Sequence, residues 1–209
     1  MNVAVLGATG RTGRPLVDEL LRRGHTGTAL ARDPAKLAEL GGRVRVVTGT
    51  STDPAALDDL LTGTDAVVSA LGPSTKEATL HTDTAHALVQ AMARHGVTRF
   101  IGISGAGIDV PGDTKGPRDK AISWMVKKMG GPVAADKQTE YAAYAASDLD
   151  WTLVRPPRLV DGPPTGRIYH HAHTPGRSSS LRRTDLALLL ADVLDQHLYP
   201  RQAPFVAQS

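Results

Sequence analysis

The sequence has 209 residues, of which 41% are hydrophobic and 22% charged, as in a globular protein with a sizeable core. Its net charge of +3 and its 4% of aromatic residues exclude a basic, base-stacking surface, so we expect no nucleic-acid partner. Because cysteine is absent, disulfides, thiolate nucleophiles and cysteine-bound metals are excluded. We expect a cytoplasmic protein, a monomer or weak homodimer, with no signal peptide and no membrane-spanning segment.

Short apolar runs alternate with amphipathic helices in the first half of the chain, which is typical of βαβ units and a parallel sheet. The runs are nearly all apolar, as expected when helices cover both faces of a sheet. Asp33-Pro34 and Asp53-Pro54 each indicate a helix start, since Asp accepts free N–H groups and proline is tolerated in the first turn. The predicted strands are 3–6, 26–31, 44–47, 66–71 and 99–103, and the predicted helices are 11–23, 33–40, 53–61 and 78–95.

The second half of the chain is less regular. Glycines and prolines interrupt residues 105–135, where one apolar helical face indicates either packing or a mobile pocket wall. That face consists of Ile122, Met125, Val126 and Met129. A helix over 134–146, a sixth strand over 151–155, a last helix over 184–197 and an edge strand at 205–206 complete the predicted elements.

The order of these elements predicts an α/β fold with a Rossmann-type doubly wound parallel sheet. We expect a single NAD(P)-binding domain over residues 1–209 with a small C-terminal substrate-side extension. Residues 105–135 and 156–183 are predicted to form the substrate side.

A glycine-rich turn, Gly7-Ala8-Thr9-Gly10-Arg11-Thr12-Gly13, follows the first strand and opens the first helix. In a dinucleotide site the first glycine permits the tight turn, the second lets the pyrophosphate approach, and the third lets helix and strand pack closely. The free N–H groups and the dipole of the helix favour phosphate charge. Gly7, Gly10 and Gly13 therefore predict a nicotinamide dinucleotide site.

The end of the second strand indicates which dinucleotide binds. An NAD site usually has an acid there for the ribose 2′-hydroxyl, whereas an arginine accommodates a 2′-phosphate. Here the strand ends Ala31-Arg32, and the first acid, Asp33, is expected to cap a helix. Arg11 could reach the same phosphate from the other side. We predict NADP(H), with solvated surface charges as the alternative interpretation of both arginines.

The run from Val3 to Gly13 resembles the NAD(P)H-binding domain of the atypical short-chain dehydrogenase/reductases, and within them the biliverdin-IXβ reductase/flavin reductase group. The similarity continues through 29–33, 65–68, 71–72, 92–97, 155–159 and 180–187, although only the glycine turn and Arg32 are specific in themselves. It implies that Thr9, Arg11 and Thr12 hold the pyrophosphate and Arg32 the 2′-phosphate. It also implies Thr50 and Ser51 near adenine, Ala70, Leu71 and Gly72 under the ribose, and Ile103, Ser104, Pro156 and Pro157 beside the nicotinamide.

This sequence also departs from its relatives. They usually have Asp where Thr50 stands. Many use a Tyr-x-x-x-Lys pair, in which lysine lowers the phenol pKa. That pair is absent, since the residues four past Tyr141, Tyr144, Tyr169 and Tyr199 are Ala145, Asp148, His173 and Ala203. The flavin-reductase-like group also lacks it, but has a pocket serine and histidine where this chain has Gly105 and Arg158. The substrate therefore does not carry over.

Ser104 and Arg158 are the catalytic candidates. Hydride transfer to a conjugated acceptor needs orientation and a water-poor site more than acid–base help. Ser104 could orient the carboxamide or the acceptor, or else bond the turn's backbone. Arg158 could hold an anionic acceptor or its developing charge, or else be a solvated loop residue. Lys137 and Tyr141 could form a catalytic pair in reversed order, although such pairs are common on helix surfaces.

Two clusters have no predicted catalytic role. His170-His171-x-His173 lies in a predicted extended stretch, whose adjacent side chains point to opposite faces, and no carboxylate is nearby, so we predict no metal. Residues 177–183 are predicted to be an exposed loop that leads into a helix.

We predict an NADPH-dependent reductase of a flavin, quinone or similar conjugated small-molecule acceptor, with residues 105–135 as pocket wall or lid. A non-catalytic NADP(H) sensor of the NmrA-like kind is an alternative that the missing Tyr/Lys pair favours. An extended-type epimerase, dehydratase or ketoreductase is another, for which the short segment after the sixth strand leaves little room. Fold alone does not distinguish them.

Overall fold

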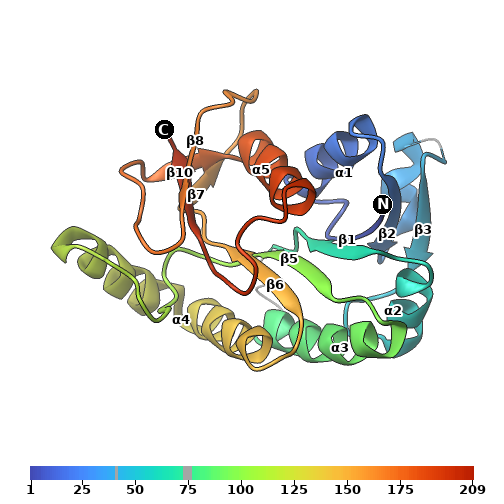
Figure 1. Cartoon of the computed structure of the whole chain (residues 1–209), viewed down its shortest axis with the longest axis horizontal. Coiled ribbons are helices and arrows are strands. Elements are labelled where there is room, and N and C mark those ends of the chain that lie inside the picture. The colour runs from blue at the N-terminus through green and yellow to red at the C-terminus, as the bar shows by residue number, and fades with distance from the viewer. Residues whose placement is uncertain (41, 73–76) are drawn as a thin grey trace.

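Six parallel strands form the central sheet of the computed structural model, which describes residues 1–40, 42–72 and 77–209 (Figure 1). The strand order is β3-β2-β1-β4-β5-β6. The winding reverses between β1 and β4, and in such sheets ligands bind beyond the carboxyl ends of the strands at this point. The predicted Rossmann-type doubly wound sheet is confirmed. Its strands are β1 (Asn2–Leu6), β2 (Thr26–Ala31), β3 (Val44–Thr48), β4 (Ala66–Ser69), β5 (Arg99–Ile103) and β6 (Asp150–Val154).

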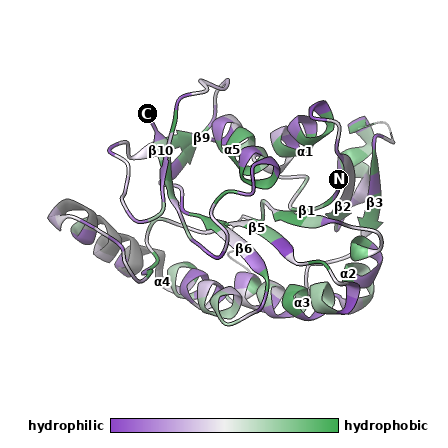
Figure 2. Ribbon diagram, viewed as in Figure 1, coloured by the Kyte–Doolittle hydropathy of each residue, from purple (hydrophilic) through white to green (hydrophobic). Residues whose placement is uncertain are grey.

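Helices cover both faces of this sheet, as the apolar strands predicted. On one face lie α1 (Gly13–Arg22) and α5 (Arg183–Asp195), and on the other lie α2 (Pro54–Leu61), α3 (Leu80–His95) and α4 (Pro117–Ala145) (Figure 1). Alternate residues of β1 therefore belong to two different cores, Val3 and Val5 to the first, Ala4 and Leu6 to the second. Figure 2 shows the resulting concentration of hydrophobic residues in the strands.

Most predicted elements are confirmed to within two residues at each end, which is the usual uncertainty of an element boundary. The segment after β2 is a 3-10 helix, η1 (Pro34–Leu40), and Asp33 Oδ1 accepts a hydrogen bond from the Ala35 N–H at 3.1 Å. The predicted capping role of Asp33 is therefore confirmed. Asp53 caps α2 in the same way.

The helix predicted over 134–146 corresponds to the second part of α4, after a kink, whereas the helix before the kink was not predicted as an element. Helical structure begins at Pro117 rather than at 134, and a kink at Gly131, with φ 44°, joins two helices. Pro132 follows the kink, where its missing N–H and its ring would disrupt a straight helix. The first part of α4 projects beyond the body of the molecule (Figure 1). The predicted apolar face of Ile122, Met125, Val126 and Met129 lies outside the described side chains.

The C-terminal extension contains two small sheets, of which the sequence analysis predicted only the edge strand at 205–206 and the extended stretch at the histidine run. In one, β7 (Arg158–Val160) pairs with β9 (Ser180–Arg182), and in the other, β8 (Ile168–His171) pairs with β10 (Phe205–Gln208). Residues 201–206 also run beside β6, where Leu153 N–H donates to Gln202 O and Arg155 N–H to Pro204 O. These strands have three or four residues, too few for a periodic signal. No helix in the described ranges is both long and apolar enough to cross a bilayer.

We expect Tyr144→Ala to lower the free energy of unfolding by about 3–5 kcal/mol. Tyr144 of α4 stacks on Phe100 of β5 at 4.2 Å between ring centroids and is 1% exposed, so its ring packs α4 against the sheet. Trp124, an aromatic residue of the same helix that is 63% exposed, is the control, and Trp124→Ala should change stability by about 0.5 kcal/mol or less. Urea denaturation measures both, and equal losses would contradict this account.

Candidate functional site

A pocket of about 690 Å³ lies over the carboxyl ends of β1, β2 and β4, where the winding of the sheet reverses. We call it the switch-point pocket. Most of the residues predicted to hold a dinucleotide meet there, although they come from four separate parts of the chain. Its lining includes Gly7, Thr9, Gly10, Ala31, Arg32, Thr50, Ser51, Ala70, Leu71 and Gly72.

Backbone crowding at this pocket explains the glycines of the turn. Gly7 has φ +75°, and a Cβ there would lie 2.7 Å from the carbonyl group of Ala70 at the end of β4. A Cβ on Gly13 would overlap the carbonyl oxygen of Gly7. The Gly10 N–H donates to the same oxygen at 2.9 Å, which closes the turn. The glycines therefore let the β1–α1 turn pass directly against β4.

Three predicted contacts flank this turn. Thr12 is buried at the N-terminus of α1, but its side chain makes no cap bond, which leaves the first amides of the helix without that partner. The Arg11 side chain lies 3.3 Å from Asp161, which also accepts from Arg183 at 2.7 Å. Arg11 thus contacts the C-terminal extension. Its role in binding a phosphate stays a prediction, and that role requires the side chain to turn away from Asp161.

Arg32 stands where β2 ends, at the rim of the switch-point pocket. Its side chain is 80% exposed, and its ion pair with Glu77 across the pocket is long, at 4.0 Å. Asp33, the next acid in the chain, is occupied by its cap on η1. On the other side of the pocket, the Ser51 hydroxyl bonds to Thr84 of α3 at 2.6 Å. The rim therefore carries Arg32 and Glu77, one charge of each sign, while Ser51 connects the pocket to α3.

A buried polar cluster lies below the carboxyl end of β5. Lys137 Nζ donates to Ile103 O at 2.7 Å, to His81 Nδ1 at 2.9 Å and to a Glu140 carboxylate oxygen at 3.0 Å. Burial lowers the pKa of Lys137 and raises that of Glu140, while attraction between the two charges opposes both shifts. Asp136 accepts from the backbone N–H groups of His81 and Thr82. The cluster thus places Lys137, ion-paired with Glu140, at the end of β5.

Two buried atoms of this region have no hydrogen-bond partner among the described residues, Ser104 Oγ and His81 Nε2. Ser104 donates its backbone N–H to Val154 O at 2.8 Å. The side chain therefore does not bond the backbone of its turn. Whether Ser104 orients a carboxamide or an acceptor stays a prediction.

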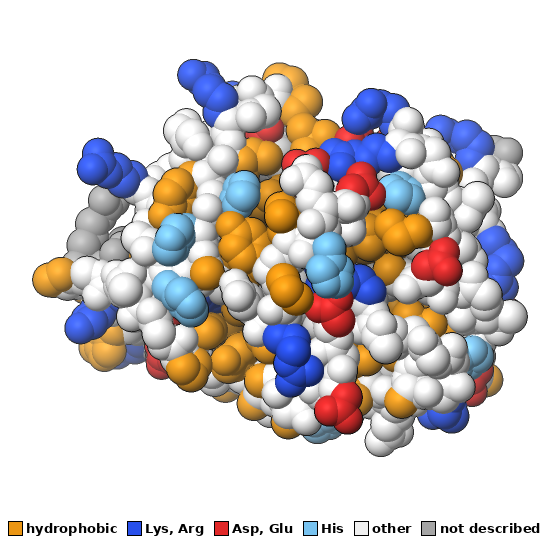
Figure 3. Space-filling model, in the orientation of Figure 1, with side chains coloured by type: hydrophobic (Ala, Val, Ile, Leu, Met, Phe, Trp, Pro, Cys, Tyr) orange, Lys and Arg blue, Asp and Glu red, His pale blue; other side chains and the backbone are white. Residues whose placement is uncertain are grey.

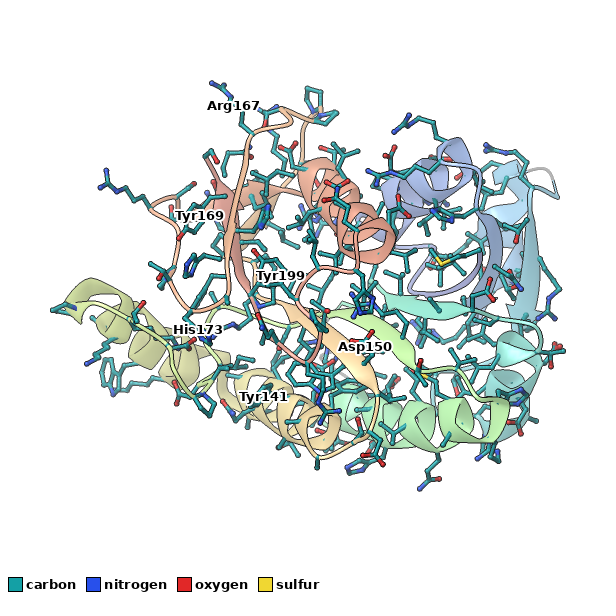
Figure 4. The ribbon with its side chains drawn as sticks, in the orientation of Figure 1. Tyr141, Asp150, Arg167, Tyr169, His173 and Tyr199 are labelled. Carbon is teal, nitrogen blue, oxygen red and sulfur yellow. The ribbon has the colours of Figure 1, made fainter. Side chains whose placement is uncertain are left out.

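Lys137 and Tyr141 do not contact each other as a catalytic pair. Lys137 points to Ile103, whereas Tyr141 lies edge-on to Trp151 with ring centroids 5.8 Å apart (Figure 4). Sequence reasoning missed the other members of the cluster, Glu140 and His81. Glu140 could have been predicted, because residues three apart on a helix, such as Lys137 and Glu140, are neighbours. His81 lies 56 residues away, and nothing local indicated that it faces Lys137.

A second pocket, of about 450 Å³, lies between the loop after β5, the loop after β6 and the C-terminal extension. We call it the extension pocket. In sheet order it lies on the β6 side of β5, whereas the switch-point pocket lies on the β4 side, so Ile103 and Ser104 stand between the two. Its lining consists of Gly105, Ala106, Gly107, Lys115, Arg155, Pro156, Pro157, Arg158, residues 175–179, Phe205, Val206 and Ala207.

Arg155 holds the walls of this pocket together. It is fully buried, forms a two-bond pair with Asp113 at 2.7 Å, donates to Ala203 O at 2.6 Å, and stacks on Phe205 at 3.6 Å. It thereby joins the end of β6 to the loop after β5 and to the C-terminal strand. The sequence analysis placed Arg155 at the end of a strand but missed this role. The sequence feature that could have indicated this role is the charge of Arg155 at the end of an otherwise apolar run.

The histidine run is dispersed, and its predicted extended conformation is confirmed by β8. His170 Nδ1 bonds the Tyr199 hydroxyl at 2.6 Å, while His171 Nδ1 accepts the N–H groups of His173 and Thr174. Figure 3 shows several histidines spread over this face rather than gathered. Within the described ranges, no group of three His, Asp or Glu could hold a metal ion. The predicted loop at 177–183 was partly wrong, because β9 pairs there with β7.

Comparison with known proteins agrees with this geometry. The NAD(P)H-binding family matches residues 7–197. Oxidoreductase stcQ of Emericella nidulans is 31% identical, over 92% of this chain and 76% of that protein. A solved structure from Burkholderia pseudomallei, named as an exported protein, is 32% identical, with a TM-score of 0.78 over 99% of both chains. One from Bacillus halodurans, named as an NAD-dependent epimerase/dehydratase, is 26% identical, with a TM-score of 0.81 over 100% of this chain and 94% of that one.

We expect His81→Asn to weaken the dependence of stability on acid pH. Burial, and then the charge of Lys137, lower the pKa of His81 from 6.5 to about 3. Between these values the unfolded chain binds a proton that the folded chain does not. The free energy of unfolding therefore falls as the pH drops from 6.5 towards 3, by up to about 1.4 kcal/mol per pH unit.

The asparagine introduced by this substitution would keep an acceptor for Lys137 Nζ but would not titrate. Urea denaturation at about pH 7 and about pH 5 should show a smaller loss in His81→Asn than in the natural protein. His86→Asn, at an exposed position of the same helix, is the control and should keep the natural loss. Equal losses in all three proteins would contradict a neutral, buried His81.

Proposed function

The chain belongs to the NAD(P)H-binding family, and from this premise we propose that it is an NADPH-dependent reductase of a conjugated small-molecule acceptor. A flavin or a quinone is the class of acceptor that we propose. The observation that carries the proposal is the adjacency of two pockets, one lined by the glycine turn and Arg32, the other apolar and open beside the end of β5.

The residues of the switch-point pocket fit a dinucleotide. The crowding of Gly7 and Gly13 leaves backbone where a Cβ would otherwise stand, so a pyrophosphate can approach the first amides of α1. Arg32 can turn towards a 2′-phosphate, because its ion pair with Glu77 is long and exposed. We assign adenine to the part of the pocket near Thr50 and Ser51, and the ribose to the part near Ala70 and Leu71.

At the end of β5 and in the extension pocket, we propose that fixed charge and exclusion of water assist hydride transfer. A bound nicotinamide would supply the hydride. The Lys137 ammonium, held at the end of β5, favours negative charge that develops on a nearby acceptor. Ser104 is the candidate for orienting the carboxamide or acceptor, and Pro156 and Pro157 exclude water from one side. Arg158 is the candidate for holding an anionic acceptor.

The extension pocket favours an enzyme over a non-catalytic NADP(H) sensor, because a sensor needs no second cavity beside the nicotinamide end of its cofactor site. Its volume of about 450 Å³ is within the usual range of small-molecule sites. A cytoplasmic location and a monomeric or weakly dimeric state stay predictions.

The activity test is a screen of purified protein with NADPH and a panel of flavins, quinones and tetrapyrroles. We expect NADPH oxidation, followed at its absorbance, with at least one flavin or quinone. Lys137→Met should lower kcat by about tenfold or more, because it removes the cation at the end of β5. Failure of the whole panel to oxidise NADPH would overturn the proposed reductase.

We expect Arg32→Ala to raise the Kd for NADPH about 10- to 100-fold and to leave the Kd for NADH nearly unchanged. The charged hydrogen bonds that arginine makes to a phosphate are worth about 1.5–3 kcal/mol. Arg22→Ala is the control, since Arg22 ends α1 at the end of the helix remote from the glycine turn and is 69% exposed. Calorimetry measures each affinity. Tighter binding of NADH than NADPH by the natural protein would contradict NADP(H) as the cofactor.

A further inference from the structure

Arginines of this chain are nearly all paired. Among those whose side chains the structure describes, only Arg158, Arg167 and Arg177 have neither an ion pair nor a side-chain hydrogen bond to a described residue. Two of these three, Arg158 and Arg177, line the extension pocket. An unpaired guanidinium is common on a surface, but two that converge on one apolar cavity indicate a ligand.

The small sheet of the extension brings these two arginines to the same pocket. Arg158 begins β7 and pairs with Ser180 of β9, and Arg177 precedes Ser180 by three residues. Both side chains are exposed, whereas the backbone around Arg177 is held closely. A Cβ on Gly176 would lie 2.6 Å from Ala207 Cβ and 2.8 Å from the Tyr169 ring. The backbone of this loop therefore packs tightly against β8 and β10, whereas the Arg177 guanidinium has no partner among the described residues.

The other charges of the pocket are already balanced. Its lining contains four basic residues and no acidic one among the described parts of the chain. Of the four, Arg155 is paired with Asp113, and Lys115 contacts Asp113 at 3.6 Å and Asp109 at 3.4 Å. The positive charge of Arg158 and Arg177 is thus left without a counter-charge from any residue that the structure describes.

The rest of the lining is suited to a flat, conjugated molecule. Pro156, Pro157, Phe205, Val206 and Ala207 provide its apolar walls. A guanidinium matches the planar, two-oxygen geometry of a carboxylate or phosphate. A ligand with an apolar ring system and one such anionic group would fill the walls and satisfy both arginines.

We propose that the acceptor is an anionic conjugated molecule whose carboxylate or phosphate is held by Arg158 and Arg177 at the extension pocket. The inference rests on the proposed reductase activity and names its class of substrate. The anionic group takes no part in the electron transfer. It fixes the ring against the pocket wall, so that hydride from NADPH and a proton from solvent both reach the ring.

Pairs of acceptors that differ only in charge test this inference. FMN and riboflavin share the same ring and differ in the phosphate, and anthraquinone-2-carboxylate and its neutral carboxamide differ in the carboxylate. We expect kcat/KM for the anionic member to exceed that of the neutral member by about tenfold or more. This preference should shrink at high salt, because the arginines are exposed.

Arg158→Ala and Arg177→Ala should each reduce the anionic preference, and the double variant should bring the ratio close to one. Arg167→Ala is the matched control. Arg167 belongs to the same extension and is also unpaired, but it does not line the pocket and points outward (Figure 4). It should leave the ratio unchanged. Thermal melting checks that all variants fold.

The outcomes separate the two proposals. Equal use of both members of each pair, or a preference that all three single variants leave intact, would overturn the anionic class and leave the reductase standing. Reduction of neutral acceptors alone would do the same. If no acceptor of either charge supports NADPH oxidation, the reductase and the inference fall together.

Discussion

The contact of two backbones at the switch point is the constraint on which the rest of the structure depends. Gly7 passes so close to the carbonyl group of Ala70 that a side chain would overlap it, and Gly13 lies still closer to Gly7. This approach brings the amino end of α1 over the carboxyl ends of β1 and β4. The backbone of the glycine turn therefore forms part of the wall of the switch-point pocket, and backbone amides at a helix start favour phosphate.

Two buried charge clusters lie at the carboxyl ends of the next two strands, β5 and β6. At the end of β5, Lys137 and Glu140 place charge beside Ser104, and at the end of β6, Arg155 and Asp113 join the loops that form the cavity. Burying such groups is costly unless each charge is paired and bonded. Both pairs meet that condition. The first pair places charged groups beside the end of β5. The second pair connects the loop after β5 to the end of β6 and so fixes the position of that loop.

The C-terminal extension couples the two pockets physically. Asp161 joins Arg11 of the glycine turn to Arg183 of α5. Asp185, fully buried, accepts from the backbone of Thr165 and Gly166 and so holds the loop between β7 and β8. Burial opposes ionisation of this carboxyl, but these hydrogen bonds lower its pKa on balance. The C-terminal extension therefore contacts the glycine turn through Asp161 and lines the extension pocket through residues 175–179 and 205–207.

The sequence by itself determined the parallel sheet, the glycine turn, the place of Arg32 and the cap at Asp33, because each depends on neighbours within one turn or one strand. It did not determine the helix from Pro117, the pairing of β7 with β9, the partners of Lys137 and Arg155, or the place of Arg177 at the extension pocket. Those residues are polar or lie in short segments, and they acquire a role only from residues 20 to 60 positions away. Tertiary structure decided them, since burial and facing charge arise only after the loops have packed on the sheet.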